Sequence, residues 1–188
     1  VMVGPATYLT LGKVTDGSNL DKFDLADSLI EVYVQIAEKL AADGAEWLQI
    51  DEPIFSLDLN DAQRAVIEKA YARLAQVDGI KIMVANYFGE LADNMELFTS
   101  LPVAALHIDA VRGIKEAEVV AARLDYEKYL SVGIIDGRNI WKTDLERAFA
   151  TIETVKGEIG AERLIVGPSC SLLHSPVTLR SETKLDDE

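Results

Sequence analysis

Short segments in which apolar and polar residues alternate are separated, along this chain, by longer segments with helical spacing. The clearest alternation lies just before Pro53, where Leu48 and Ile50 would face one side of a strand and Gln49 and Asp51 the other. Because proline cannot donate to a sheet, this strand is predicted to end there. Other apolar or alternating segments predict strands at residues 1–3 and 8–11 (interrupted by Gly4-Pro5), 79–87, 104–111, 129–135 and 163–166.

Apolar residues at spacings of three and four predict helices between these strands, over residues 25–42, 61–76, 91–100, 114–124 and 143–159. Asp24 would cap the first helix and Asp61 the second, while Thr143 and Glu146 form a capping-box pattern before the last, which Gly160 would end. The apolar stripes expected to face the core are Leu25, Leu29, Val32, Ile36 and Leu40 in the first helix, Val66, Ala70 and Leu74 in the second, and Leu91, Met95 and Phe98 in the third.

The alternation of about six strands with five helices predicts a parallel sheet, because crossovers of this length join parallel strands. An open, doubly wound sheet buries both faces and needs almost wholly apolar strands, whereas Gln49, Asp51, His107 and Asp109 alternate with apolar residues. No GxGxxG motif follows the first strand, which disfavours a dinucleotide-binding fold. We therefore predict an α/β (β/α)8 barrel forming a single domain over residues 1–188. It would be incomplete, since eight strand–helix units need about 250 residues.

Composition and charge restrict the partners and the location of the protein. The chain has 188 residues, of which 49% are hydrophobic and 27% charged, as in one globular domain. Its net charge of −14 argues against nucleic-acid or anionic-membrane partners, and no apolar run approaches the ~20 residues that span a bilayer. One cysteine and no basic leader predict a cytoplasmic protein. The chain starts within a strand and ends in a polar stretch, so we expect a segment of a longer protein.

Acidic residues lie at the predicted carboxyl end of the strand before Pro53, and α/β folds bind ligands at this edge. Asp51 and Glu52 are therefore candidates to contact a substrate amine or a cation, or to act as a base. They could instead accept backbone hydrogen bonds and cap the next loop; if both are buried, a nearby cation or a raised pKa is expected. His107 and Asp109 share one face of their strand, close enough for a hydrogen-bonded pair, although a lone strand histidine is more often a core residue.

The sequence Asp136-Gly137-Arg138-Asn139 follows a parallel strand and precedes a helix, so we interpret it as a loop at the barrel mouth rather than a hairpin turn. Arg138 is the best anion-binding candidate, because its planar fork matches a carboxylate.

Ser169, Cys170 and Ser171 follow the last predicted strand, and His174 lies close in sequence. A cysteine–histidine nucleophile is one interpretation of this segment. A small buried cysteine is the more common one, and no activating partner can be identified from the sequence.

Several motifs together resemble one family. They are GPATYLTLGK at 4–13, QIDEP at 49–53, ANYFG at 85–89, LHIDAVRG at 106–113, GIIDGRNIW at 133–141 and PSCSLLHSPV at 168–177. In this order and spacing they resemble the amino-terminal half of cobalamin-independent methionine synthase, the 5-methyltetrahydropteroyltriglutamate–homocysteine methyltransferase.

The resemblance implies an enzyme of two (β/α)8 barrels that transfers a methyl group from a folate polyglutamate directly to homocysteine. Zinc in the carboxyl-terminal barrel would bind homocysteine as a thiolate, which lowers the thiol pKa and supplies the nucleophile. The amino-terminal barrel would support the structure and contribute to binding the polyglutamate tail. The substrate-binding residues expected in this segment are Asp51, Glu52, Asp109, Asp136, Arg138, Asn139 and Ser169.

The sequence departs from the family's catalytic barrel, whose zinc ligands are His-x-Cys, Glu and Cys after successive strands. The corresponding places here are residues 85–87, the Asp109 region and Cys170, so only the last cysteine is retained. One thiolate cannot form a tetrahedral zinc site, and the zinc ligands are expected outside this segment. The two first barrel strands, which carry the family's basic tail-binding residues, are also missing. We therefore expect the segment alone to be inactive.

Two alternatives stay open at this point. One is a self-sufficient barrel enzyme related to uroporphyrinogen decarboxylase, which would use Asp51, His107 and Arg138. The other is a non-catalytic binding or assembly module, because an incomplete barrel leaves sheet edges that can pair with another chain.

Overall fold

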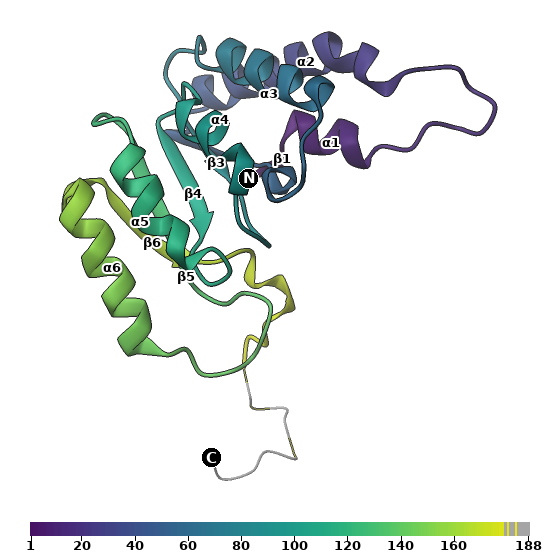
Figure 1. Cartoon of the computed structure of the whole chain (residues 1–188). Coiled ribbons are helices and arrows are strands. Elements are labelled where there is room, and N and C mark those ends of the chain that lie inside the picture. Colours follow the sequence, from purple (N-terminus) through teal and green to yellow (C-terminus); the bar gives the residue numbers. More distant parts are fainter. Residues whose placement is uncertain (179, 181–182, 184–188) are drawn as a thin grey trace.

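One curved parallel sheet organises the molecule (Figure 1). The computed structural model describes residues 1–178, 180 and 183. Six parallel strands follow one another in chain order. They are β1 (Met2–Val3), β2 (Trp47–Asp51), β3 (Lys81–Ala85), β4 (Ala105–Asp109), β5 (Tyr129–Ile135) and β6 (Leu164–Pro168). Because the strand order never reverses, successive right-handed crossovers place their helices on the same face. This is the arrangement of a barrel, and the prediction of an incomplete (β/α)8 barrel is confirmed at six strands.

Helices form the outer layer of the curved sheet (Figure 1). The α-helices are α1 (Pro5–Leu11), α2 (Ala26–Ala42), α3 (Asp61–Leu74), α4 (Met95–Ser100), α5 (Ile114–Arg123) and α6 (Leu145–Ile159). Short 3-10 helices are η1 (Lys22–Leu25), η2 (Pro53–Ser56), η3 (Ala92–Asn94), η4 (Ala161–Arg163) and η5 (Leu172–His174). No helix in the described part of the chain is long and apolar enough to cross a membrane.

The strand register brings the carboxyl ends of the strands to one edge. Asp51 at the end of β2 lies opposite Ala85 of β3, and Ala85 lies opposite His107 of β4. Asp109 at the end of β4 lies opposite Gly133 of β5. The sheet and the helix layer enclose the apolar core, to which Leu48 and Ile50 contribute from the outward face of β2, as their alternation predicts.

Residues 8–11 are helical, so the strand predicted there is wrong. Pro5 occupies the first turn of α1, where its fixed φ favours a helix and its missing N–H costs nothing. The helix is completed by tertiary contacts: the backbone N–H groups of Ala6 and Thr7 donate to the Glu52 carboxylate, 46 and 45 residues away in sequence.

The stripe predicted for α2 is also wrong in part. Its buried residues include Ile30, Val34 and Ala37, whereas the predicted Val32 and Ile36 are exposed, and so is Leu25, which lies in η1. The helix carries two apolar stripes, and the one that includes Tyr33 is buried, with the Tyr33 hydroxyl group donating to the Val3 carbonyl.

Three helix starts differ from the predicted caps. Asp24 lies inside η1, which Asp21 caps, and α3 begins after Asn60 in a capping box with Gln63. Asp144, not Thr143, caps α6 by accepting a hydrogen bond from the Arg147 N–H. The helix end predicted at Gly160 is confirmed.

The predicted buried faces of the next two helices are largely confirmed. Val66, Ala70 and Leu74 are buried in α3, and Leu91 and Phe98 are buried in and before α4. Met95 is only partly buried.

Candidate functional site

The inner face of the sheet becomes polar toward its carboxyl edge. Asp51 lies there, and its two carboxylate oxygens accept hydrogen bonds from different donors. Gln49 Nε2 donates to Oδ1 at 2.7 Å, and the Tyr87 hydroxyl group donates to Oδ2 at 3.0 Å. Burial, followed by the charge and hydrogen bond of Asp51, raises the pKa of Tyr87 far above its usual value, so this phenol stays protonated.

His107 is held neutral beside Asp51 on the same inner face. Its Nε2 lies 3.3 Å from the Ser169 carbonyl oxygen and its Nδ1 lies 2.8 Å from the Ser131 hydroxyl oxygen. Because a carbonyl only accepts, Nε2 carries the proton and Nδ1 accepts from Ser131. Burial lowers the pKa of His107. The predicted hydrogen-bonded pair of His107 and Asp109 is wrong, because both residues have other partners.

These residues line a cavity of about 470 Å³ on the concave face of the sheet. Its polar lining includes Gln49, Asp51, Tyr87, His107 and Ser131, and its apolar lining includes Met83, Ile165 and Pro168. The prediction of an inner face with polar residues near the mouth is thereby confirmed.

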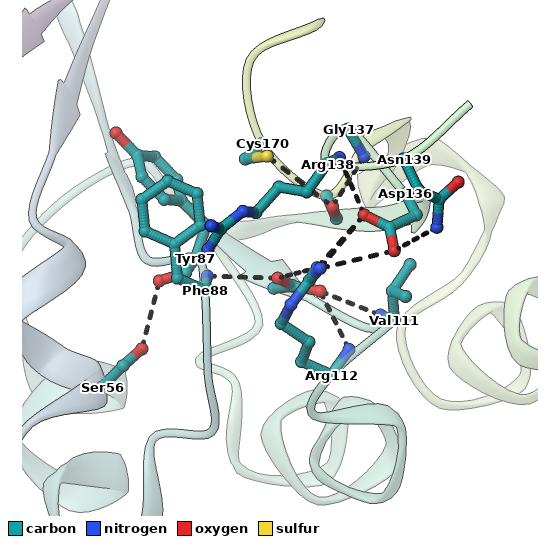
Figure 2. A network of polar contacts seen from close by, with 12 residues as sticks. Ser56, Tyr87, Phe88, Val111, Arg112, Asp136, Gly137, Arg138, Asn139 and Cys170 are labelled. Carbon is teal, nitrogen blue, oxygen red and sulfur yellow. Dashed lines mark hydrogen bonds and ion pairs between the residues drawn. The ribbon is translucent and has the colours of Figure 1, made fainter. Parts of the chain in front are cut away.

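A second polar cluster ties the loops after β3, β4 and β5 together (Figure 2). Asp109, whose side chain is 0% exposed, accepts backbone hydrogen bonds from Phe88, Val111 and Arg112 at 3.0–3.1 Å. The Arg112 guanidinium lies 3.3 Å from the carboxylates of both Asp109 and Asp136. Burial alone would lower the pKa of Arg112, but these two charges outweigh it and raise the pKa.

The loop after β5 is folded around Asp136. This carboxylate accepts from the Arg138 backbone N–H at 2.9 Å and from Asn139 Nδ2 at 2.8 Å. The Ser169 hydroxyl oxygen accepts from the Gly137 N–H at 3.2 Å, which joins this loop to the end of β6. The predicted mouth loop is therefore confirmed in its position.

Arg138 extends across this loop toward Phe88 (Figure 2). Its guanidinium carbon lies 4.8 Å from the centre of the Phe88 ring, a cation–π arrangement. Phe88 has a φ of 80°, which few non-glycine residues adopt, and its N–H donates to Asp109. The exposed Arg138 forms no ion pair among the residues that the structure describes.

Glu52 does not join its neighbour Asp51 at the mouth. It is 0% exposed and faces the helix layer, where it accepts from Ala6, Thr7 and Tyr71. Burial raises its pKa, an effect that these hydrogen bonds oppose. Glu52 thus has the structural role that the sequence offered as an alternative. It does not face Asp51, because the two carboxylates point to opposite faces of the sheet.

The residues at the places of the family's zinc ligands do not fit a metal site. Asp109 is occupied by Arg112 and by backbone N–H groups, and Tyr87 donates to Asp51. Burial raises the pKa of the Cys170 thiol, which disfavours the thiolate that zinc requires. In the described residues, no three His, Cys, Asp or Glu side chains could share a metal ion. The side chain of His174 lies outside the described residues, so the cysteine–histidine interpretation stays untested.

The structure gathers Asp51, Asp109, Asp136, Arg138, Asn139 and Ser169 at one edge of the sheet, in two adjoining clusters. Arg112, Tyr87 and Phe88 also belong to these clusters and were not predicted from the sequence. Arg112 follows Asp109 by three residues directly after a strand, and this spacing of opposite charges could have indicated the pair.

A parallel sheet that curves in chain order, with its polar side chains at the carboxyl edge, defines the (β/α)8-barrel class. Solved structures agree. A protein from Listeria monocytogenes described as a vitamin-B12 independent methionine synthase aligns with a TM-score of 0.67 at 16% identity, over 92% of this chain and 57% of that one. A B12-independent methionine synthase from Shewanella gives 0.65 at 20% identity, over 90% and 53%. At these identities, the likeness concerns the fold alone.

Sequence relatives define the family. The family model described as the cobalamin-independent synthase N-terminal domain matches residues 1–160. The chain is 48% identical to the 5-methyltetrahydropteroyltriglutamate–homocysteine methyltransferase of Nitrobacter winogradskyi and 44% identical to that of Salinibacter ruber, over its whole length. It therefore belongs to the cobalamin-independent methionine synthase family, as a segment of the N-terminal domain. It spans 24% of the length of these relatives.

Proposed function

We propose that this chain works as part of a longer enzyme that transfers a methyl group from 5-methyltetrahydrofolate polyglutamate to homocysteine. The observation that carries this proposal is the match of the whole chain to methyltransferases four times its length. In this proposal the segment supports the enzyme and contacts the folate tail, while the homocysteine-binding zinc belongs to the remaining part. The misfit of Asp109, Tyr87 and Cys170 to a metal supports that division.

The mouth offers a contact for the polyglutamate tail. A polyglutamate carries one carboxylate per residue, and Arg138 presents an exposed guanidinium that has no ion-pair partner among the described residues. Asp136 positions this loop through the Arg138 N–H and Asn139, and Ser169 holds it through Gly137. Arg138 and Asn139 would thus contact the tail, while Asp109, Asp136 and Ser169 would position them.

Titrating the purified chain with a triglutamyl folate, followed by calorimetry, tests this contact. Arg138→Met should weaken binding about two- to fivefold, the range that one exposed charge pair supplies. Arg123→Met, which removes an equal charge from the exposed end of α5, is the matched control and should bind like wild type. A monoglutamyl folate should bind more weakly than the triglutamate and should respond less to the loss of Arg138.

Equal weakening by Arg138→Met and Arg123→Met would reduce the effect to net charge and contradict the proposed contact. The same conclusion would follow if wild type bound monoglutamyl and triglutamyl folates with equal affinity.

A further inference from the structure

The two arginines of the mouth loops have different partners. Arg112 is the ion-pair partner of both carboxylates in these loops, at 3.3 Å from Asp109 and 3.3 Å from Asp136. It reaches both oxygens of Asp136, one of which also accepts from the Arg138 backbone N–H. Asp136 is therefore already engaged and does not hold the Arg138 guanidinium. In the described part of the chain, that guanidinium lies instead over the Phe88 ring, 4.8 Å from its centre.

The Phe88 ring is itself held in place by its surroundings (Figure 2). Its backbone has a φ of 80°, and its N–H donates to the buried Asp109 carboxylate at 3.1 Å. The Tyr87 ring packs edge-on against it, with the ring centres 4.5 Å apart and an angle of 71° between the planes. The Ser56 hydroxyl group donates to the Tyr87 carbonyl oxygen at 3.2 Å and anchors the loop from the other side. A bulky residue keeps such a backbone conformation only where its neighbours impose it, as these contacts do.

A fixed ring beside a long cationic side chain has a consequence for binding. An arginine that is ordered only when the ligand arrives loses rotamer freedom at that moment, which weakens the complex. A ring face attracts the guanidinium without engaging its N–H donors in an ion pair, so the planar fork stays available for an anion. The Phe88 ring therefore orders Arg138 in advance, whereas a carboxylate in the same place would compete with the ligand.

We propose that Phe88 is a positioning residue for Arg138 and thereby contributes to the preference for a polyglutamyl over a monoglutamyl folate. This inference rests on the proposed contact between Arg138 and the folate tail. The juxtaposition that carries it is an aromatic ring, fixed in an uncommon backbone conformation, beside a guanidinium that the acidic residues of the mouth loops do not hold.

NMR of the purified chain without ligand tests the arrangement. The side-chain protons of Arg138 should lie upfield of their usual positions, because the face of an aromatic ring shields nearby protons. Phe88→Tyr retains a ring and should keep this shift. Phe88→Asn should remove it, and asparagine is chosen because it tolerates a positive φ better than most residues. Arginine signals at their usual positions in wild type would overturn the proposal, and this measurement needs no variant to fold.

Calorimetric titration with triglutamyl folate tests the consequence for binding. Phe88→Asn should weaken binding about two- to fivefold, the loss also expected for Arg138→Met, while Phe88→Tyr should bind like wild type. In the Arg138→Met background, Phe88→Asn should cause no further loss, because the residue that the ring positions is then absent. Tyr126→Asn removes another exposed ring, just before β5, and should leave binding unchanged.

The outcomes separate this inference from the proposed function. If wild type prefers the triglutamate and Phe88→Asn does so equally, the tail contact stands and the role of Phe88 is contradicted. A further loss from Phe88→Asn in the Arg138→Met background would show a general structural effect and would also contradict that role. Equal wild-type affinity for the monoglutamyl and triglutamyl folates would overturn the tail contact, and with it this inference.

Discussion

At the scale of single residues, Glu52 connects two distant parts of the chain. Its carboxylate accepts from two backbone N–H groups of α1, from the Thr7 hydroxyl group and from Tyr71, all in a buried environment. Gly4 makes room for it, because a Cβ at that position would lie 2.1 Å from the carboxylate carbon. The position of Glu52 directly after a strand was predicted correctly from the sequence. Its role depended on α1, which was mistaken for a strand, and hence could not be predicted.

We expect Glu52→Gln to destabilise the fold by about 1–3 kcal/mol, because its amide nitrogen would face the backbone N–H group of Ala6 or of Thr7, each of which can only donate. Tyr71→Phe removes one of the four donors and should cost less. Urea unfolding measures both free energies. Equal stability of Glu52→Gln and wild type would contradict the structural role assigned to this carboxylate.

The burial of His107 predicts a pH dependence of stability. Its folded-state pKa is lowered below the usual value of 6.5, so below that pH the unfolded chain binds more protons than the folded chain. Stability should therefore fall as the pH decreases from about 7 to about 5. The raised pKa of Glu52 acts in the opposite direction: its contribution is largest at low pH and decreases as the pH rises from 4.5 through its folded-state pKa.

Urea midpoints across this pH range separate the two effects when wild type is compared with His107→Gln. In the variant, the part of the loss of stability between pH 7 and pH 5 that His107 causes should be absent. An unchanged pH profile in His107→Gln would show that His107 is not held neutral in the folded chain.

At the scale of elements, the close contact of β5 with its neighbours depends on Gly133. A Cβ at this position would lie 2.5 Å from the Ser169 Cα and 3.0 Å from the Ile108 carbonyl oxygen. Both are backbone atoms, so β4 or β6 would have to move. Gly157 in α6 has open space around the same position.

The two glycines give a matched pair of substitutions. Gly133→Ala should destabilise the fold by about 1–3 kcal/mol through overpacking. Gly157→Ala should stabilise it by about 0.5–1 kcal/mol, because alanine is the better helix former. Thermal unfolding should therefore shift in opposite directions, and a Gly133→Ala variant as stable as wild type would contradict the strand packing.

The loops after β3, β4 and β5 are coupled through Arg112. We expect Arg112→Met to cost about 1–2 kcal/mol, less than for a fully buried pair because Arg112 is partly exposed. The double variant with Asp109→Asn should cost less than the sum of the single variants, since the two residues contact each other. Strict additivity in urea unfolding would contradict the coupling.

Strands and helix packing were predictable from the sequence to different degrees. The alternation around Asp51 and Asp109 predicted both strands and the side of the sheet that their side chains face. The buried stripe of α2 could not be predicted in the same way, because the helix has two apolar stripes and their spacing alone does not tell which one faces the sheet. The spacing of Arg112 and Asp109 could have indicated their ion pair, whereas the second partner, Asp136, comes from the end of another strand and could not be predicted.

At the scale of the whole molecule, six parallel strands form part of a barrel, and β1 and β6 each pair on one side only within the described residues. The motifs of the chain predicted the family, and the relatives confirm it. These observations support the proposal that this segment contacts the folate, while the zinc site lies in the remaining three quarters of the enzyme. Its central claim is that this segment binds folate without performing the methyl transfer.

The most direct test is an assay of the purified 188-residue chain with zinc, homocysteine and triglutamyl 5-methyltetrahydrofolate. We expect saturable binding of the folate and no methionine above the level of the protein-free control. Methionine formation by the chain alone would contradict it, because the reaction would then need no other domain.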